Sequence, residues 1–242
     1  MDVTNPGEYE RQLRREANRE ARRKRESGSI VKPQRTTLRI IGGDMRTRKI
    51  EFQTDMHTRP MKDRTREAIF SRLSDEVVDT TAIDLFAGSA ILAFESLSRG
   101  AARAIAVEKQ ADRIAEINEN AKRLKIDAVI SAHHADAFRV SHNPAKFVEA
   151  ATGGVGSQSP WTFFCCPPYS LWDSDLAEMK RLVTAWLSRC PLGSNVVVEL
   201  HETTDPQFLW DEPGYEWFHR GYRPAQIAIG SRTSIVEAAA PA

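Results

Sequence analysis

Three polar positions follow apolar runs in the sequence and carry groups that could hold a nucleoside. The run Asp84–Ser89, DLFAGS, contains Gly88, which lets the backbone turn tightly and present N–H groups to a ligand where a helix begins, and Ser89 could cap that helix. Glu108 follows about 20 residues after this turn, and a carboxylate there can accept hydrogen bonds from both ribose hydroxyls. Asp136, after the next run, can accept from an adenine amino group. Together these residues predict an adenosine site.

A fourth apolar run, WTFFCC, contains two of the three cysteines and leads into a rigid PPY turn. Cys165, Cys166 and Cys190 form no C-x-x-C pair and have no histidine near them in sequence, so we expect neither a zinc site nor a disulfide framework. No apolar run approaches the roughly 20 residues that a membrane span needs, and the N-terminus is charged. We therefore expect a cytoplasmic protein with reduced thiols, no metal and no membrane contact, and a monomer.

These candidate residues lie among segments that alternate between strand and helix patterns from Thr81 onward, which predicts a βαβαβ arrangement and hence a parallel sheet. The segment ADRIAEINENAKRL has one apolar stripe, so we expect a helix that covers the sheet. His133 and His134 are expected in an exposed loop. Further predictions are a strand over WTFFCC, a helix over 173–189, a strand over NVVVEL, and tail strands over 216–219, 225–229 and 233–237.

The region before the sheet divides into a charged extension and a basic hairpin. Residues 1–37 mix charges of both signs and then carry Gly, Ser and Pro, which predicts a flexible or solvated helical extension ahead of a domain over 38–242. Residues 38–55 contain two short β-type runs around Gly42-Gly43-Asp44, which predicts a hairpin or a bent pair of strands. The segment MKDRTREAIFSRL that follows has helical spacing.

Positive charge is concentrated in the first third of the chain. Residues 1–66 contain 18 Lys and Arg against 10 Asp and Glu, whereas the remaining residues contain 16 against 23. A cluster of basic side chains before the sheet could contact phosphates without reading a base sequence, although it could equally be a solvated face. The candidate RNA-binding residues are Arg39, Arg46, Arg48, Lys49, Arg59, Arg64 and Arg66.

Five segments, in this order, resemble the RsmD family of bacterial methyltransferases, which act on a guanine of 16S ribosomal RNA: LRIIGGDMRTRKI, TRPMKDRTREAIF, DLFAGSAILAFESLSRGA, VEK and CCPPY. The resemblance covers about residues 38–229. It implies an α/β fold of class I, Rossmann-like, with a seven-stranded, mostly parallel sheet, helices on both faces and an N-terminal hairpin that helps hold RNA. It also implies S-adenosyl-L-methionine as cofactor and ribosomal RNA or the 30S particle as partner. The cofactor residues carried over are Asp84, Phe86, Ala87, Gly88, Ser89, Glu108, Lys109, Asp136 and Ala137.

The fourth motif of this family normally has Asp or Asn before Pro-Pro-Tyr, and here Cys166 precedes Pro167, Pro168 and Tyr169. In such a site, acceptors orient an exocyclic amine toward the sulfonium methyl, the prolines stiffen the turn and the aromatic ring stacks on the base. A thiol is a weak acceptor, so loss of one such bond would cost about 1.5–3 kcal/mol, or a factor of roughly 10 to 150 in rate. Activity reduced by Cys166 is therefore expected.

A second departure concerns Ala90, which replaces the second glycine of the family's Gly-Ser-Gly. A methyl group is tolerated at an ordinary φ but would crowd a ligand if the backbone must approach it closely.

Several alternatives remain open from the sequence. Cys166 could be a covalent nucleophile, or Cys165 and Cys166 could be small buried residues of a strand whose function has drifted. The leading prediction is transfer of a methyl group to the exocyclic N2 of a guanine in small-subunit rRNA. The rivals are a non-catalytic RNA-binding protein and an adenine-N6 DNA methyltransferase.

Overall fold

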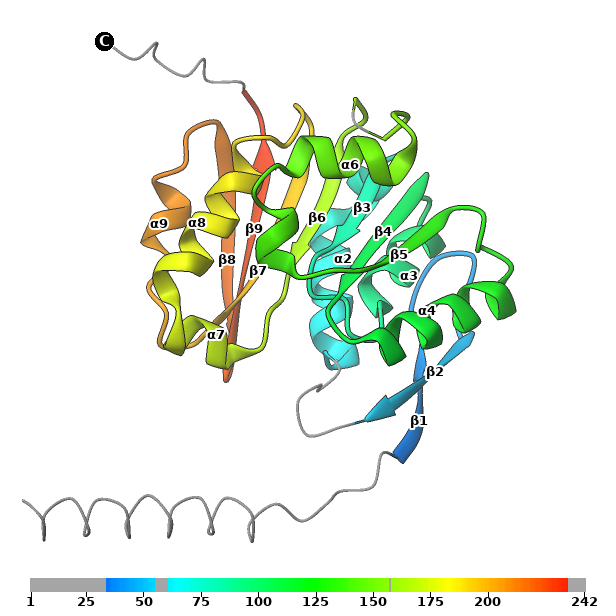
Figure 1. Cartoon of the computed structure of the whole chain (residues 1–242). Helices are drawn as coiled ribbons and strands as arrows, with labels where there is room; N and C mark the ends of the chain where they lie inside the picture. Colours follow the sequence, from blue (N-terminus) through cyan, green and yellow to red (C-terminus); the bar gives the residue numbers. More distant parts are fainter. Residues whose placement is uncertain (1–33, 55–60, 157, 235–242) are drawn as a thin grey trace, which may run out of the picture.

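The structure is a computed structural model that describes residues 34–54, 61–156 and 158–234. Its main sheet contains β3 (Thr81–Asp84), β4 (Arg103–Glu108), β5 (Ile130–His134), β6 (Trp161–Cys165), β7 (Asn195–His201), β8 (Tyr215–Tyr222) and β9 (Ala225–Arg232). The strand order is β5-β4-β3-β6-β7-β9-β8 (Figure 1). Strands β3 to β7 pair in parallel, and β9 runs antiparallel to both β7 and β8. The predicted seven-stranded, mostly parallel sheet is confirmed.

The remaining elements are one hairpin and a set of helices. The hairpin pairs β1 (Gln34–Arg39) with β2 (Lys49–Thr54) in antiparallel register. The helices are α2 (Asp63–Leu73), the 3₁₀ helix η1 (Ser74–Val77), α3 (Ile91–Ser98), α4 (Ala111–Leu124), α5 (Ala137–Val140), α6 (Pro144–Thr152), α7 (Tyr169–Ser174), α8 (Leu176–Leu187) and α9 (Gln207–Trp210).

Helices cover both faces of the main sheet, because successive strand residues point in opposite directions. In β6, Phe164 packs against Phe70 of α2 in a cluster that also holds residues of α3 and α4. Its neighbour Phe163 stacks on Trp186 of α8, with ring centroids 4.7 Å apart, in a second cluster shared with α6 and α9. Figure 1 shows α6 and α8 on the near side of the sheet. Both layers leave the carboxyl ends of the parallel strands available for a site.

The hairpin is fastened to the C-terminal half of α4. The Arg48 guanidinium donates to the carbonyl oxygens of Leu124 at 3.1 Å and Arg123 at 3.0 Å, where the helix dipole favours a cation. The Asn120 side chain exchanges two hydrogen bonds with the backbone of Glu51, at 2.7 and 2.9 Å. The hairpin is therefore held against the helix layer by polar contacts from Arg48 and from Glu51 of its second strand.

Several element boundaries differ from the sequence predictions. Strand β1 begins at Gln34, inside the predicted extension, whereas residues 1–33 lie outside the described residues. Strand β5 includes His133 and His134, which were expected in a loop, because the pairing with β4 continues to Glu108 and His134. The helix predicted over 173–189 is two helices that meet at Asp175. The last predicted tail strand is wrong at 233–234, which carry no strand, and its remainder lies outside the described residues.

Ala90 has a left-handed backbone conformation that the sequence analysis did not anticipate. Its φ is 56°, its ψ is 26°, and it is the N-cap residue of α3 in place of the expected Ser89. An L-residue in this region costs about 1 kcal/mol or more, which accounts for a preference for glycine at this position. The methyl group is fully buried in the core cluster and does not line the cavity described below, so it does not crowd a ligand there.

Candidate functional site

The ends of the parallel strands surround one cavity of about 790 Å³. All of the predicted cofactor and catalytic residues line it: Asp84, Phe86, Ala87, Gly88, Ser89, Glu108, Lys109, Asp136, Ala137, Cys166, Pro167, Pro168 and Tyr169. They come together because β3 lies between β4 and β6, so the glycine turn and the Pro-Pro-Tyr turn leave the sheet side by side. The cavity lies where the order of the parallel strands reverses, the usual ligand position in such sheets.

Glu108 holds the glycine turn in place. One carboxylate oxygen accepts from the Gly88 backbone N–H at 2.8 Å, and the other accepts from the Gln110 N–H at 2.8 Å. Gly88 has a φ of 51°, which glycine adopts without strain. Each carboxylate oxygen has two lone pairs, so Glu108 retains acceptor capacity toward the cavity.

Asp136 and Lys109 form an ion pair beside this turn. The Lys109 Nζ lies 3.1 Å from Asp136, and the same carboxylate accepts from the Phe138 N–H at 2.9 Å as the N-cap of α5. Burial alone would raise the pKa of Asp136, but the hydrogen bonds from Lys109 and Phe138 lower it. Asp136 is therefore an ionised acceptor, and Lys109 lies beside it at the cavity.

Asp84 is the most strongly perturbed acid of the site. It is 2% exposed, and burial together with the nearby Glu108 charge raises its pKa to about 7. A buried carboxylate usually has a cationic partner. No Lys or Arg of the described ranges forms an ion pair with Asp84. A cationic ligand in the cavity would therefore stabilise the ionised form of this carboxyl.

The Pro-Pro-Tyr corner starts where β6 ends. Cys166 is partly exposed, Pro167 is buried, and Tyr169 begins α7. Burial, followed by the charges of Glu199 and Asp84, raises the pKa of the Cys166 thiol well above its usual range. A nucleophilic cysteine needs a lowered pKa, so this environment argues against the covalent alternative.

Glu199, in β7, is a cavity residue that the sequence analysis missed. Its Oε1 accepts a hydrogen bond from the Tyr169 hydroxyl at 2.7 Å. Burial raises the pKa of Glu199, and this hydrogen bond partly offsets the rise. A carboxylate near the end of NVVVEL was a usable signal, because the same reasoning singled out Glu108 after AIAV. The turn between β8 and β9 also lines the cavity through Tyr222, Arg223 and Pro224.

The predicted RNA-binding residues divide into exposed and structural ones. Arg46, Lys49 and Arg64 are exposed. Arg39 is exposed but pairs with Asp63 at 2.8 Å. Arg48 is exposed and caps α4 as described above, and Arg59 lies outside the described residues.

Arg66 is a correction to the sequence analysis. It is 0% exposed and donates to Glu95 at 2.7 Å, to Asp63 at 2.5 Å and to the Arg39 carbonyl at 3.0 Å. It therefore cannot contact RNA in this structure. The reason is its place on the buried face of α2, where Ile69, one helical turn along, also lies.

Within the described ranges, no group of three or more His, Cys, Asp or Glu side chains could hold a metal ion. Nor does any helix of the described part of the chain have the length and apolar character required to cross a membrane.

Comparisons with known proteins identify the family of this chain. The family model described as "Conserved hypothetical protein 95" matches residues 38–204. The chain is 32% identical over 132 residues to "Putative rRNA methyltransferase YlbH" of Bacillus subtilis, a match that covers 54% of this chain and 67% of the relative. It is 40% identical over 88 residues to "Ribosomal RNA small subunit methyltransferase D" of Escherichia coli, covering 36% of this chain and 44% of that relative.

A solved structure shows the same fold. "Putative methyltransferase yhhF" from Escherichia coli superimposes with a TM-score of 0.63 at 23% identity, covering 82% of this chain and 99% of that one. Since the family model spans more than half of the sequence, the chain belongs to the family described as "Conserved hypothetical protein 95", that of the RsmD-like methyltransferases.

Proposed function

We propose that this chain is an S-adenosylmethionine-dependent RNA methyltransferase that modifies the exocyclic N2 of a guanine in 16S ribosomal RNA. One observation carries the proposal: the glycine turn after β3 and the Pro-Pro-Tyr turn after β6 open on the same cavity. The names of the curated relatives, which are rRNA methyltransferases, support RNA as substrate. The match covers less than half of the Escherichia coli relative, so the guanine and the 16S target rest on the family resemblance.

The residues present fit S-adenosylmethionine. The cavity volume lies within the roughly 300–1,000 Å³ that small-molecule sites occupy. The carboxylates of Asp84, Glu108 and Asp136 line it and suit a ligand with an ammonium group, a sulfonium and two ribose hydroxyls. When bound, S-adenosylmethionine supplies an electrophilic methyl group on its sulfonium.

The contribution of the chain is alignment of the acceptor amine. The Pro167-Pro168 turn fixes the backbone carbonyls that can accept from the amine, because proline restricts φ. The Tyr169 ring offers a stacking surface, and its hydroxyl is anchored by Glu199. Methyl transfer of this kind gains chiefly from holding the reacting atoms in line, so the weak Cys166 acceptor reduces the rate without removing the whole effect.

Exposed cations of the chain can position the RNA backbone. Arg46, Lys49 and Arg64 lie on or next to the hairpin, and Lys62 and Arg223 line the cavity. Contacts from such residues to phosphates would orient the RNA without reading its sequence. In this proposal the partner is ribosomal RNA in the 30S particle, and the protein acts as a monomer in the cytoplasm.

Radiolabelled cofactor and unmodified 30S particles test the proposal. We expect label in 16S rRNA as N2-methylguanine, and a variant with Gly88→Val in the cofactor turn provides the negative control because its φ of 51° disfavours a β-branched residue. Absence of label, when calorimetry shows cofactor binding, would reject the proposal. Label in adenine of DNA would support the adenine-N6 alternative instead.

Cys166 also favours one rival, a non-catalytic protein that binds RNA and the cofactor. A wild-type protein that binds both but transfers nothing, and that gains activity when Cys166 is replaced by Asn, would support this rival.

A further inference from the structure

We propose that Glu199 recognises the target guanine by accepting hydrogen bonds from its N1–H and N2–H groups, and thereby supplies the acceptor that Cys166 lacks. This inference rests on the proposed function, since it concerns the base that the cavity receives. It assigns substrate recognition to β7, whereas the family motifs found in the sequence lie on the hairpin, α2 and the strands β3, β4 and β6.

Strand pairing brings Glu199 beside Cys166. The last paired residues of β6 and β7 are Cys165 and Val198, so Cys166 and Glu199 follow them in register. The Glu199 charge is near enough to act on Cys166, since burial and then the charges of Glu199 and Asp84 raise the pKa of the Cys166 thiol. Both side chains line the same cavity. An acceptor on Glu199 is thus close to the position where the family carries Asp or Asn.

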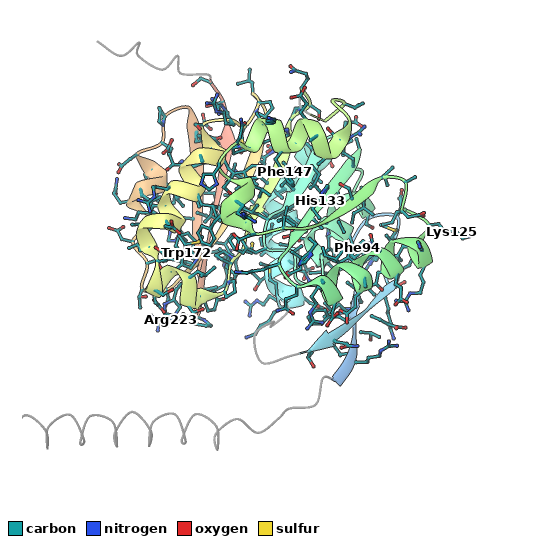
Figure 2. All side chains as sticks on the ribbon, in the orientation of Figure 1. Phe94, Lys125, His133, Phe147, Trp172 and Arg223 are labelled. Atoms are coloured by element: carbon teal, nitrogen blue, oxygen red, sulfur yellow. The ribbon has the colours of Figure 1, made fainter. Side chains whose placement is uncertain are left out.

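Hydrogen bonds hold both the side chain and the backbone of Glu199. The Tyr169 hydroxyl donates to Oε1 at 2.7 Å. On the backbone side, Trp172, labelled in Figure 2, donates its indole N–H to the Glu199 carbonyl at 3.0 Å. No Lys or Arg among the residues that the structure describes forms an ion pair with this carboxylate. Removing a carboxylate from water is costly unless hydrogen bonds compensate, so this carboxylate favours a ligand that donates to it.

The donors of guanine match this carboxylate. Guanine presents N1–H and N2–H side by side on its Watson–Crick edge, and a carboxylate provides two acceptors in the same spacing. Adenine presents an amino group beside the unprotonated N1, so one carboxylate oxygen would face a lone pair. Sites built on such buried polar groups reject the mismatched base strongly. Glu199 would therefore select guanine over adenine as well as orient the amine.

A purely structural role is the competing explanation, in which Glu199 only holds Tyr169 at the start of α7. Two measurements separate the explanations, because neither ligand preference nor rescue from position 166 should depend on a structural hydrogen bond.

The first measurement is nucleotide binding to the full chain saturated with S-adenosylhomocysteine, which prevents turnover. The indole N–H signal of Trp172 in a protein labelled with ¹⁵N-tryptophan reports titrations with GMP and AMP. We expect GMP to bind at least roughly tenfold more tightly than AMP, and Glu199→Gln to reduce that preference by a factor of roughly 10 or more. Glu178→Gln, which replaces a Glu of α8 that pairs with Arg181 at 3.7 Å, should leave the preference unchanged. Equal binding of both nucleotides by the wild type, or a preference retained by Glu199→Gln, would overturn the inference.

The second measurement is transfer to 30S particles by the variants Glu199→Gln, Cys166→Asn and the double variant. We expect Glu199→Gln to lower kcat/KM by a factor of roughly 10 to 150, with unchanged cofactor affinity showing that the fold is intact. Cys166→Asn should raise kcat/KM by a larger factor in the Glu199→Gln background than in the wild type, because it restores a missing acceptor. Equal factors in both backgrounds would overturn the inference. If the wild type transfers nothing yet prefers GMP through Glu199, the proposed function fails and the inference stands.

Discussion

Asp84 should make both the stability and the cofactor affinity of this protein depend on pH, and Asp84→Asn removes that dependence. The carboxyl titrates near 3.8 when unfolded and at about 7 in the folded protein. Between these values the folded protein holds more protons than the unfolded chain. The contribution of Asp84 to the free energy of unfolding is therefore complete below about pH 4 and is lost as the pH rises through 7.

The size of this effect follows from the difference between the two pKa values. At about 1.36 kcal/mol per unit, that difference corresponds to about 4 kcal/mol in total. Roughly 3 kcal/mol of it falls between pH 5 and pH 8. Because Asp84 is 2% exposed, solvent screens its charge little and this free-energy difference applies in full.

Urea unfolding of the wild type and of Asp84→Asn at several pH values between 5 and 8 measures this contribution. The free energy of unfolding of the wild type should fall by roughly 3 kcal/mol more than that of Asp84→Asn over this range. Asp127→Asn replaces an exposed aspartate and should follow the wild type. Parallel curves for the wild type and Asp84→Asn would refute the assignment of a raised pKa to Asp84.

Cofactor binding should respond in the opposite direction. The ammonium and sulfonium of S-adenosylmethionine favour the ionised form of Asp84, so the affinity of the wild type should fall by about tenfold for each pH unit below 7. Calorimetry in buffers of different ionisation enthalpy should detect proton release on binding near pH 6. In Asp84→Asn the affinity should be weaker and this release should be absent. Release of equal size in both proteins would place the titrating group elsewhere.

Three further predictions follow from the same contacts. Cys166→Asn should raise kcat/KM of the wild type, by less than in the Glu199→Gln background. Cys166→Asp should gain less than Cys166→Asn at pH 7, because the burial and the acidic neighbours that raise the thiol pKa would also disfavour the charged form of a new carboxyl; a larger gain for Cys166→Asp would contradict this. Arg66→Met should lower the free energy of unfolding in urea by about 3–5 kcal/mol, because it removes the closer of the two cations that pair with the buried Glu95 and leaves Arg99 at 3.6 Å; a loss below about 1 kcal/mol would contradict the buried pair. Replacing Arg46 and Lys49 together by Ala should weaken RNA binding, measured by fluorescence anisotropy. The slope of log affinity against log salt concentration should become about 1.4–1.8 less steep, and an unchanged slope would exclude phosphate contacts at both residues.

The sequence by itself predicted the alternation of strands and helices and the residues that meet in the cavity at the ends of β3, β4 and β5. The glycine turn and the carboxylates Glu108 and Asp136 follow successive strands of one parallel sheet. The carboxyl ends of such strands must lie at one edge, so local patterns predict that these residues share a cavity. The Pro-Pro-Tyr turn could be placed at the same edge for the same reason.

Only the tertiary structure decided that Glu199 lines the cavity and which of the basic side chains are exposed. Glu199 lies beside Cys166 because β7 pairs with β6, and Arg66 is buried because α2 packs its side chain against Glu95 of α3. The left-handed φ of Ala90 could not be predicted from the sequence either, because it depends on the conformation of the folded turn. These features depend on contacts between residues distant in the chain or on backbone geometry. Neither long-range contacts nor backbone geometry can be read directly from residue types and their spacing.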